Sequence, residues 1–83
     1  MQNSTTINAA MGKAVKVLRI HLKYKQDYLA NSANITVKTL SNIENGRAGI
    51  DIDKLHRISA CLNIPISLIL DLAMDIVKKR EEN

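Results

Sequence analysis

The chain has 83 residues, which is enough for one small domain and is near the lower limit for folding on hydrophobic burial alone. Hydrophobic residues make up 46% and aromatic residues only 2%, a composition that favours packed helices over a sheet. A single cysteine excludes an intrachain disulfide, and there is no apolar run of about 18 residues to predict a membrane span. We therefore expect one helical domain in a reducing cytoplasm, with no membrane partner.

The formal net charge of +4 is unevenly distributed along the chain. Residues 13–47 contain seven Lys and Arg residues against two acidic residues, a net charge of +5. Residues 48–77 contain two basic and four acidic residues, a net charge of −2. An ordinary solvated surface explains a charge of +4, but the asymmetry indicates one side that faces a polyanion.

The chain begins with a polar, unpatterned stretch and continues into a periodic one. We expect residues 1–8 to be a flexible tail, with Thr6 or Asn8 capping the first helix, and residues 9–80 to form the domain. Over residues 9–22 an apolar stripe at steps of three and four predicts an amphipathic helix, formed by Met11, Ala14, Val15, Leu18 and Leu22.

Residues 26–47 predict two short helices joined by a tight turn. Asn34 can form the corner, because Asn tolerates a left-handed backbone better than other residues with a side chain. Thr36 is a plausible N-cap of the second helix, and Gly46 suits the position just past its end. Each helix has an apolar face at helical spacing, formed by Leu29, Ala30 and Ala33 in the first and by Leu40 and Ile43 in the second.

Two further helices are predicted, over residues 51–62 with Asp51 as N-cap and over residues 65–79 with Pro65 in the first turn. The last helix has two apolar stripes, one of Ile66, Ile69, Leu70, Ala73 and Val77 and one of Leu68, Leu72 and Ile76. A helix packed on one side needs only one stripe. The second stripe therefore predicts a dimer interface, or a surface covered by the N-terminal tail.

In order and spacing, residues 9–70 resemble the phage Cro/repressor-like family, also called the Xre family. The resemblance rests on Gln26, Leu29-Ala30, Asn34-Ile35, Ser41 and Ile43-Glu44-Asn45-Gly46-Arg47. It implies an all-α, compact five-helix lambda-repressor-like domain, with a helix-turn-helix at its second and third helices. The chain departs from the family at Lys23, where Gly is usual, and at Lys25, where Ser or Thr is usual.

The resemblance also implies site residues, beginning with an ion pair between Arg19 and Glu44. Helical spacing places the candidate base contacts on the outer face of the second motif helix; they are Val37, Lys38, Ser41 and Asn42. Lys38 suits guanine O6 and N7, Asn42 suits adenine N6 and N7, and Val37 suits a thymine methyl group. The candidate phosphate contacts are Gln26, Thr36, Thr39, Asn45 and Arg47.

The sequence thus predicts a homodimeric transcriptional regulator that binds a palindromic site on double-stranded DNA, similar to a Cro-type repressor or a restriction-modification controller. The alternative is an antitoxin or other protein-interaction module that uses the same fold and binds its partner through the last helix. The sequence contains no Gly-rich phosphate loop, nucleophile elbow, metal cluster or suitable carboxylate pair. We therefore expect neither an enzyme nor a cofactor nor a small-molecule ligand.

Overall fold

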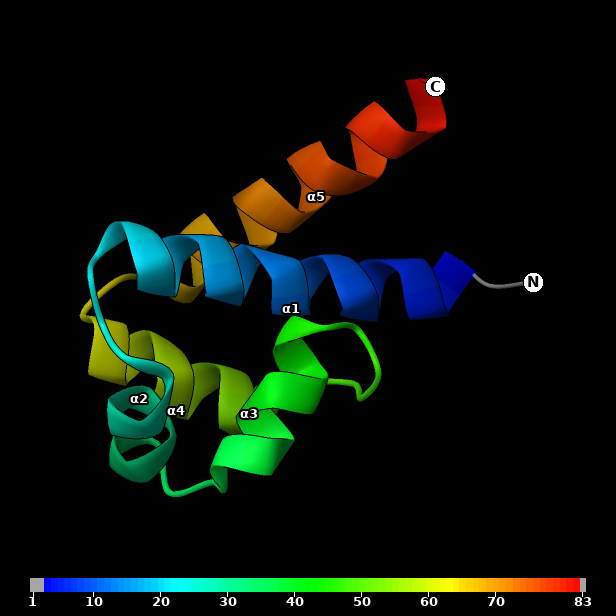
Figure 1. Cartoon of the computed structure of the whole chain (residues 1–83). Helices are drawn as coiled ribbons and strands as arrows, with labels where there is room; N and C mark the ends of the chain where they lie inside the picture. Colours follow the sequence, from blue (N-terminus) through cyan, green and yellow to red (C-terminus); the bar gives the residue numbers. More distant parts are fainter. Residues whose placement is uncertain (1–2, 83) are drawn as a thin grey trace.

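The computed structural model describes residues 3–82 and folds them into five helices. They are α1 (Asn3–His21), α2 (Gln26–Ser32), α3 (Val37–Glu44), α4 (Ile52–Leu62) and α5 (Ile66–Glu82). Helix α1 runs through the middle of the molecule, with α2, α3 and α4 on one side and α5 on the other (Figure 1). The predicted all-α, five-helix architecture is confirmed.

The core is built from aliphatic side chains of all five helices. Its largest fully buried members are Leu29, Leu40, Ile43, Leu55, Ile58, Ile69 and Val15. At Gly12 the backbone of α1 lies directly on α3, because a methyl group placed on this residue would overlap the carbonyl oxygen of Ile43. Glycine therefore allows the first helix to approach the end of the third more closely than any other residue would.

Helix α1 begins at Asn3, whereas the sequence predicts a start at residue 9. Ile7 packs against the core one turn before Met11, so the apolar stripe of the helix begins earlier than the predicted stripe, which starts at Met11. Asn8 consequently lies inside the helix and is not its cap; its Oδ1 accepts a hydrogen bond from the Ile50 amide at 3.3 Å. The first two residues of the predicted tail lie outside the described residues.

The end of α1 also differs from the expectation for residues 9–22. The helix ends at His21, and Leu22, predicted on the inward stripe, is exposed. The chain turns at Lys23, which has a φ of 67°. Lys23 thus adopts the left-handed conformation that a glycine would occupy more easily at this position.

The predicted N-cap of α4 is confirmed, and the last helix begins at Ile66, directly after Pro65. Asp51 Oδ1 accepts a hydrogen bond from the Lys54 amide at 2.8 Å and so begins α4. This backbone donor, together with the Lys54 ammonium, holds the pKa of the Asp51 carboxyl below its ordinary value. Asn63, with a φ of 59°, ends α4 in the left-handed conformation.

The two predicted stripes of α5 are distributed differently in the structure. Ile69, Ala73 and Val77 are buried as expected, but Leu70 is exposed. Leu72 and Ile76, from the second stripe, are half-buried and pack against the core, whereas Leu68 is exposed. Part of the second stripe is therefore already covered by the chain itself.

None of the five helices described is by itself long and apolar enough to cross a membrane, and α4 and α5, which reach that length only together, bend by 109° where they meet.

Gly12→Ala tests the close approach of α1 to α3. In an open helix this change stabilises by about 1 kcal/mol, because Ala is the better helix former. Here we expect a loss of about 1–3 kcal/mol in the free energy of unfolding, from the overlap with the Ile43 carbonyl. Thermal unfolding measures it, with Lys13→Ala at the neighbouring exposed position as control. A raised melting temperature for Gly12→Ala would show that the helices separate freely at this point.

Candidate nucleic-acid interface

The turn between α2 and α3 has the predicted corner. Asn34 has a φ of 61°, and the Ile35 amide donates to the Ala30 carbonyl at 3.0 Å. Ala30 itself is fully buried, and Leu29 beside it belongs to the core. The small side chain at this position lets α2 and α3 cross closely, so the turn sets the angle between the two helices.

Helix α3 is fixed at both ends by local hydrogen bonds. At its start, Thr36 Oγ1 accepts from the Thr39 amide and donates to the Thr39 hydroxyl, each at 2.9 Å. At its end, Gly46 has a φ of 77°, and the Arg47 amide donates to the Asn42 carbonyl at 2.8 Å. The N-cap and the glycine stop predicted from the sequence are both confirmed.

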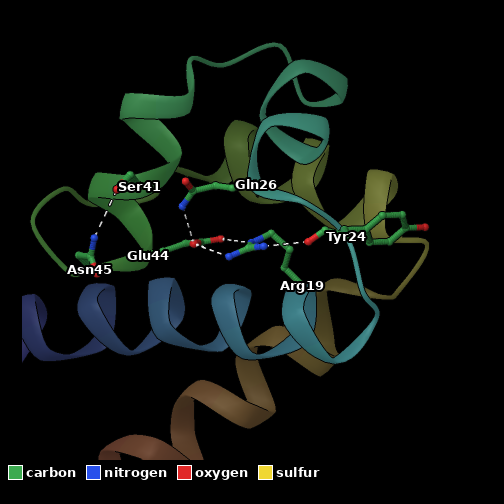
Figure 2. Close-up of polar contacts among 6 residues, drawn as sticks. All are labelled: Arg19, Tyr24, Gln26, Ser41, Glu44 and Asn45. Carbon is green, nitrogen blue, oxygen red and sulfur yellow. Dashed lines mark hydrogen bonds and ion pairs between the residues drawn. The ribbon is translucent and has the colours of Figure 1, made fainter.

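Beneath α3 lies a buried ion pair between Arg19 of α1 and Glu44 of α3 (Figure 2). Arg19 Nε donates to Glu44 Oε2 at 2.7 Å, and its Nη2 donates to Oε1 at 3.2 Å. Arg19 Nη1 donates to the Tyr24 carbonyl at 2.8 Å, and Gln26 Nε2 donates to Glu44 Oε1 at 2.9 Å. The two charged side chains are only 11% and 1% exposed, so the pair is largely removed from water.

This network joins three helices and the turn between two of them. Arg19 comes from α1, Gln26 begins α2, and Glu44 ends α3. Each carboxylate oxygen of Glu44 accepts at least one hydrogen bond, which a buried carboxylate requires. The family resemblance implies the ion pair but not the hydrogen bond that the Gln26 amide donates to Glu44.

The outward face of α3 is polar except for Val37. Val37 and Lys38, in its first turn, are exposed, and Ser41 and Asn42 are half-exposed one turn later. Leu40 and Ile43 on the opposite face are buried in the core. Asn45 follows at the end of the helix, where its Nδ2 donates to Ser41 Oγ at 3.4 Å. The structure therefore brings the candidate base contacts and Asn45 together on one helix face.

The remaining candidates surround this face. Gln26 lies at the start of α2, and Arg47 is exposed in the loop after α3. Thr36 and Thr39 lie at the start of α3, where each hydroxyl is bonded to the other. The predicted dimer residues Leu68, Leu72 and Ile76 belong to α5, on the opposite side of α1 (Figure 1).

A shallow hollow of about 300 Å³ extends the polar surface onto α1. Its lining includes Glu44 at the end of α3, Asn45 directly after it, and Lys13 and Lys16 from α1. These lysines belong to the basic half of the chain, but the sequence pattern does not place them beside Asn45. Only the packing of α1 across the end of α3 brings them there. In residues 3–82 no group of three His, Cys, Asp or Glu side chains is arranged to hold a metal ion.

Two short helices at a fixed angle, the second with a polar outward face, define a helix-turn-helix, a motif that places its second helix in the major groove of DNA. The sequence profile of the helix-turn-helix family matches residues 15–69. The chain belongs to this family, in its Cro/repressor-like (Xre) branch, whose members are DNA-binding transcriptional regulators. No curated protein matches the chain significantly.

Solved structures support the same fold. Two crystal structures of the clp gene regulator ClgR from Corynebacterium glutamicum superpose on the chain with TM-scores of 0.81 and 0.84. Their sequence identities to it are 22% and 20%. The first match covers 83% of this chain and 90% of the other, and the second covers 92% and 83%. At this identity the likeness describes the fold.

Glu44→Ala tests whether Arg19 depends on its buried partner. Removing the carboxylate leaves the Arg19 guanidinium buried without its partner, so we expect a loss of about 3–5 kcal/mol. In a chain of this size each kcal/mol lowers the melting temperature by roughly 4–8 °C. The matched control is Asp53→Ala, which breaks the exposed pair with Arg57 at 3.6 Å and should cost less than about 1 kcal/mol. Equal, small shifts for both variants would mean that solvent reaches the Arg19–Glu44 pair.

Proposed function

We propose that the chain acts as a homodimer that binds a palindromic operator, with α3 of each copy in the major groove. The observation that carries this proposal is the outward face of α3, which presents Lys38, Ser41 and Asn42 while Leu40 and Ile43 hold the helix on the core. The major groove is wide enough for a helix and shows a distinct donor and acceptor pattern for each base pair.

The base contacts are assigned by side-chain chemistry and position. Lys38 donates to guanine O6 and N7, Asn42 pairs with adenine N6 and N7, and Val37 contacts a thymine methyl group. Ser41, beside them on the same face, can donate to or accept from either kind of base. These four residues occupy the first two turns of α3, the end that recognition helices direct at base edges.

The phosphate contacts are assigned to the residues around that face. Arg47 and Asn45 are exposed after α3, and Gln26 is held at the start of α2 by Glu44. Thr36 and Thr39 lie beside the first turn of α3, where a hydroxyl that turns outward can donate to a phosphate oxygen. Such contacts position the protein on the duplex and carry no sequence information by themselves.

The dimer is assigned to the outward side of α5. Leu70 and Met74 are 41% and 55% exposed at a spacing of four, and Leu68 nearby is 40% exposed. Leu72 and Ile76 are half-buried by their own chain, so they have less surface to contribute than the sequence analysis expects. Suppose that the α5 helices of two copies pair antiparallel, with the two Met74 side chains at the centre. Asp71 lies three residues before Met74 and Lys78 four residues after it, so Asp71 of one copy then lies opposite Lys78 of the other. This charge pattern supports self-association. Two motifs about 34 Å apart then read one face of the DNA.

The function is tested by separating base contacts from phosphate contacts. Lys38→Ala and Asn42→Ala should each weaken binding to the operator by about 1–3 kcal/mol, and should weaken binding to random DNA less. Arg47→Ala should weaken both by a similar factor and should make the dependence of log K on log salt shallower by about 1. Affinities are measured over a salt series, on the operator found by footprinting and on a random duplex.

If Lys38→Ala and Asn42→Ala weaken both duplexes equally, neither residue reads bases. A chain that binds no DNA and copurifies with a partner protein would support the antitoxin-like alternative. Ile52→Ala is a suitable control, because Ile52 is exposed on α4 and has no assigned contact with DNA.

Met74→Asp tests the dimer. The substitution places two like charges against each other at the centre of the proposed interface, so we expect a folded monomer with much weaker operator binding. Burial of a Leu or Met side chain gains about 1.5–3 kcal/mol, against an association cost of about 4–15 kcal/mol. The dimer should therefore be concentration-dependent, and sedimentation is the suitable measurement. Ile20→Asp is the matched control, because Ile20 on α1 is also 55% exposed. A monomer from Ile20→Asp and a dimer from Met74→Asp would move the interface to α1.

A further inference from the structure

The N-terminal half of α1 lies outside the residues that the family profile matches, and it packs against the segment that follows α3. Gly12 lies on the Ile43 carbonyl, and a methyl group placed on Gly46 would lie 3.3 Å from Ala9 Cβ. One turn earlier, Asn8 Oδ1 accepts a hydrogen bond from the Ile50 amide at 3.3 Å. Figure 1 shows this segment directly beneath the N-terminal half of α1.

The segment Gly46–Ile50 needs such support, because two of its five residues are glycines. Its first end is held by α3, since the amides of Arg47 and Ala48 both donate to the Asn42 carbonyl, at 2.8 and 3.2 Å. Its second end is held by Ile50, whose side chain is buried and whose amide is bonded to Asn8. Asn8 also lies against Gly49, where an added methyl group would be 3.3 Å from Oδ1.

Arg47 is exposed between these two anchors. A mobile segment that becomes ordered on binding loses conformational entropy, which weakens binding. A segment that is already held in place loses less entropy and therefore binds more tightly. Arg47 needs its backbone in one place to reach a phosphate oxygen. The bond at Ile50 supplies that order from a different helix, independently of the bonds at Asn42.

We propose that Asn8 is a positioning residue for DNA binding: by holding the Ile50 amide, it keeps Gly46–Ile50 in the conformation that presents Arg47 to the DNA backbone. This inference rests on the proposed phosphate contact of Arg47. It assigns a role in binding to a turn of α1 that precedes the matched family region.

Asn8→Ala removes the acceptor and leaves the helix intact, because Ala is a better helix former than Asn. We expect the Ile50 amide to exchange hydrogen faster by about two- to tenfold, the effect of one lost hydrogen bond. Asn8→Asp keeps an oxygen acceptor and should restore the slow exchange. Asn31→Ala, at an exposed asparagine on α2, is the matched control and should leave the Ile50 amide unchanged.

The role in binding is measured on a random-sequence duplex at low salt, with a double-mutant cycle. Asn8→Ala alone should weaken binding by about two- to tenfold with little change in melting temperature, because the gain in helix propensity offsets the lost hydrogen bond. In the Arg47→Ala background the same change should weaken it by less than about twofold, because the contact that Asn8 positions is already absent.

The outcomes distinguish the phosphate contact of Arg47 from the positioning role of Asn8. If Arg47→Ala alone leaves affinity and salt dependence unchanged, the proposed phosphate contact fails and the role of Asn8 fails with it. If Arg47→Ala weakens binding and Asn8→Ala weakens it equally in both backgrounds, Asn8 does not act through Arg47. Faster exchange at Ile50 with unchanged affinity would make Asn8 a structural residue only.

Discussion

The bond network of Arg19 and Glu44 fixes how three helices meet. Aliphatic surfaces pack without strong directionality, so the core alone specifies the placement of α3 against α1 less sharply than directional bonds do. The Arg19 guanidinium donates to Glu44 with Nε and Nη2 and to the Tyr24 carbonyl with Nη1. Gln26 donates a further hydrogen bond to the Glu44 carboxylate. A buried pair gains little over an apolar one in stability, and its value lies in this fixed geometry. The network therefore ties the polar outward face of α3 to α1 and α2.

The same arginine explains how the turn after α1 tolerates an unfavourable residue. A left-handed backbone costs a residue such as Lys23 about 1–2 kcal/mol relative to glycine. The Tyr24 amide donates to the Arg19 carbonyl at 3.0 Å, and the Tyr24 carbonyl accepts from the Arg19 side chain at 2.8 Å. Both backbone groups of Tyr24, the amide and the carbonyl, are thus hydrogen-bonded to Arg19. These two local bonds hold the turn and offset the cost of a left-handed residue other than glycine. Lys25, which caps α2 without a side-chain hydrogen bond, is the second departure from the family pattern that the fold accommodates.

The parts of the structure that the sequence predicts are those whose causes are local. The cap at Thr36, the corner at Asn34, the stop at Gly46 and the cap at Asp51 each depend on bonds within a few residues. The ion pair is implied by the family resemblance and not by spacing. The bonds of Gln26 to Glu44 and of Asn8 to Ile50 are beyond prediction from the sequence pattern, because they join residues 18 and 42 positions apart that no periodicity relates. The exposure of Leu22 and Leu70 has a related cause: helical spacing predicts which side chains share a face, but the packing of other elements decides whether that face is covered.

The position of α1 separates the two surfaces that the proposed function requires. Helix α3 lies on one side of it and α5 on the other, so contacts made by α5 leave the polar face of α3 open (Figure 1). The charges follow the same division in part, since residues 13–47 carry a net charge of +5, whereas α5 has four acidic residues against three basic ones. A polyanion is therefore attracted more strongly to the α3 side than to the α5 side. Long-range electrostatics therefore favours the orientation in which α3 meets DNA and α5 remains available to a second copy.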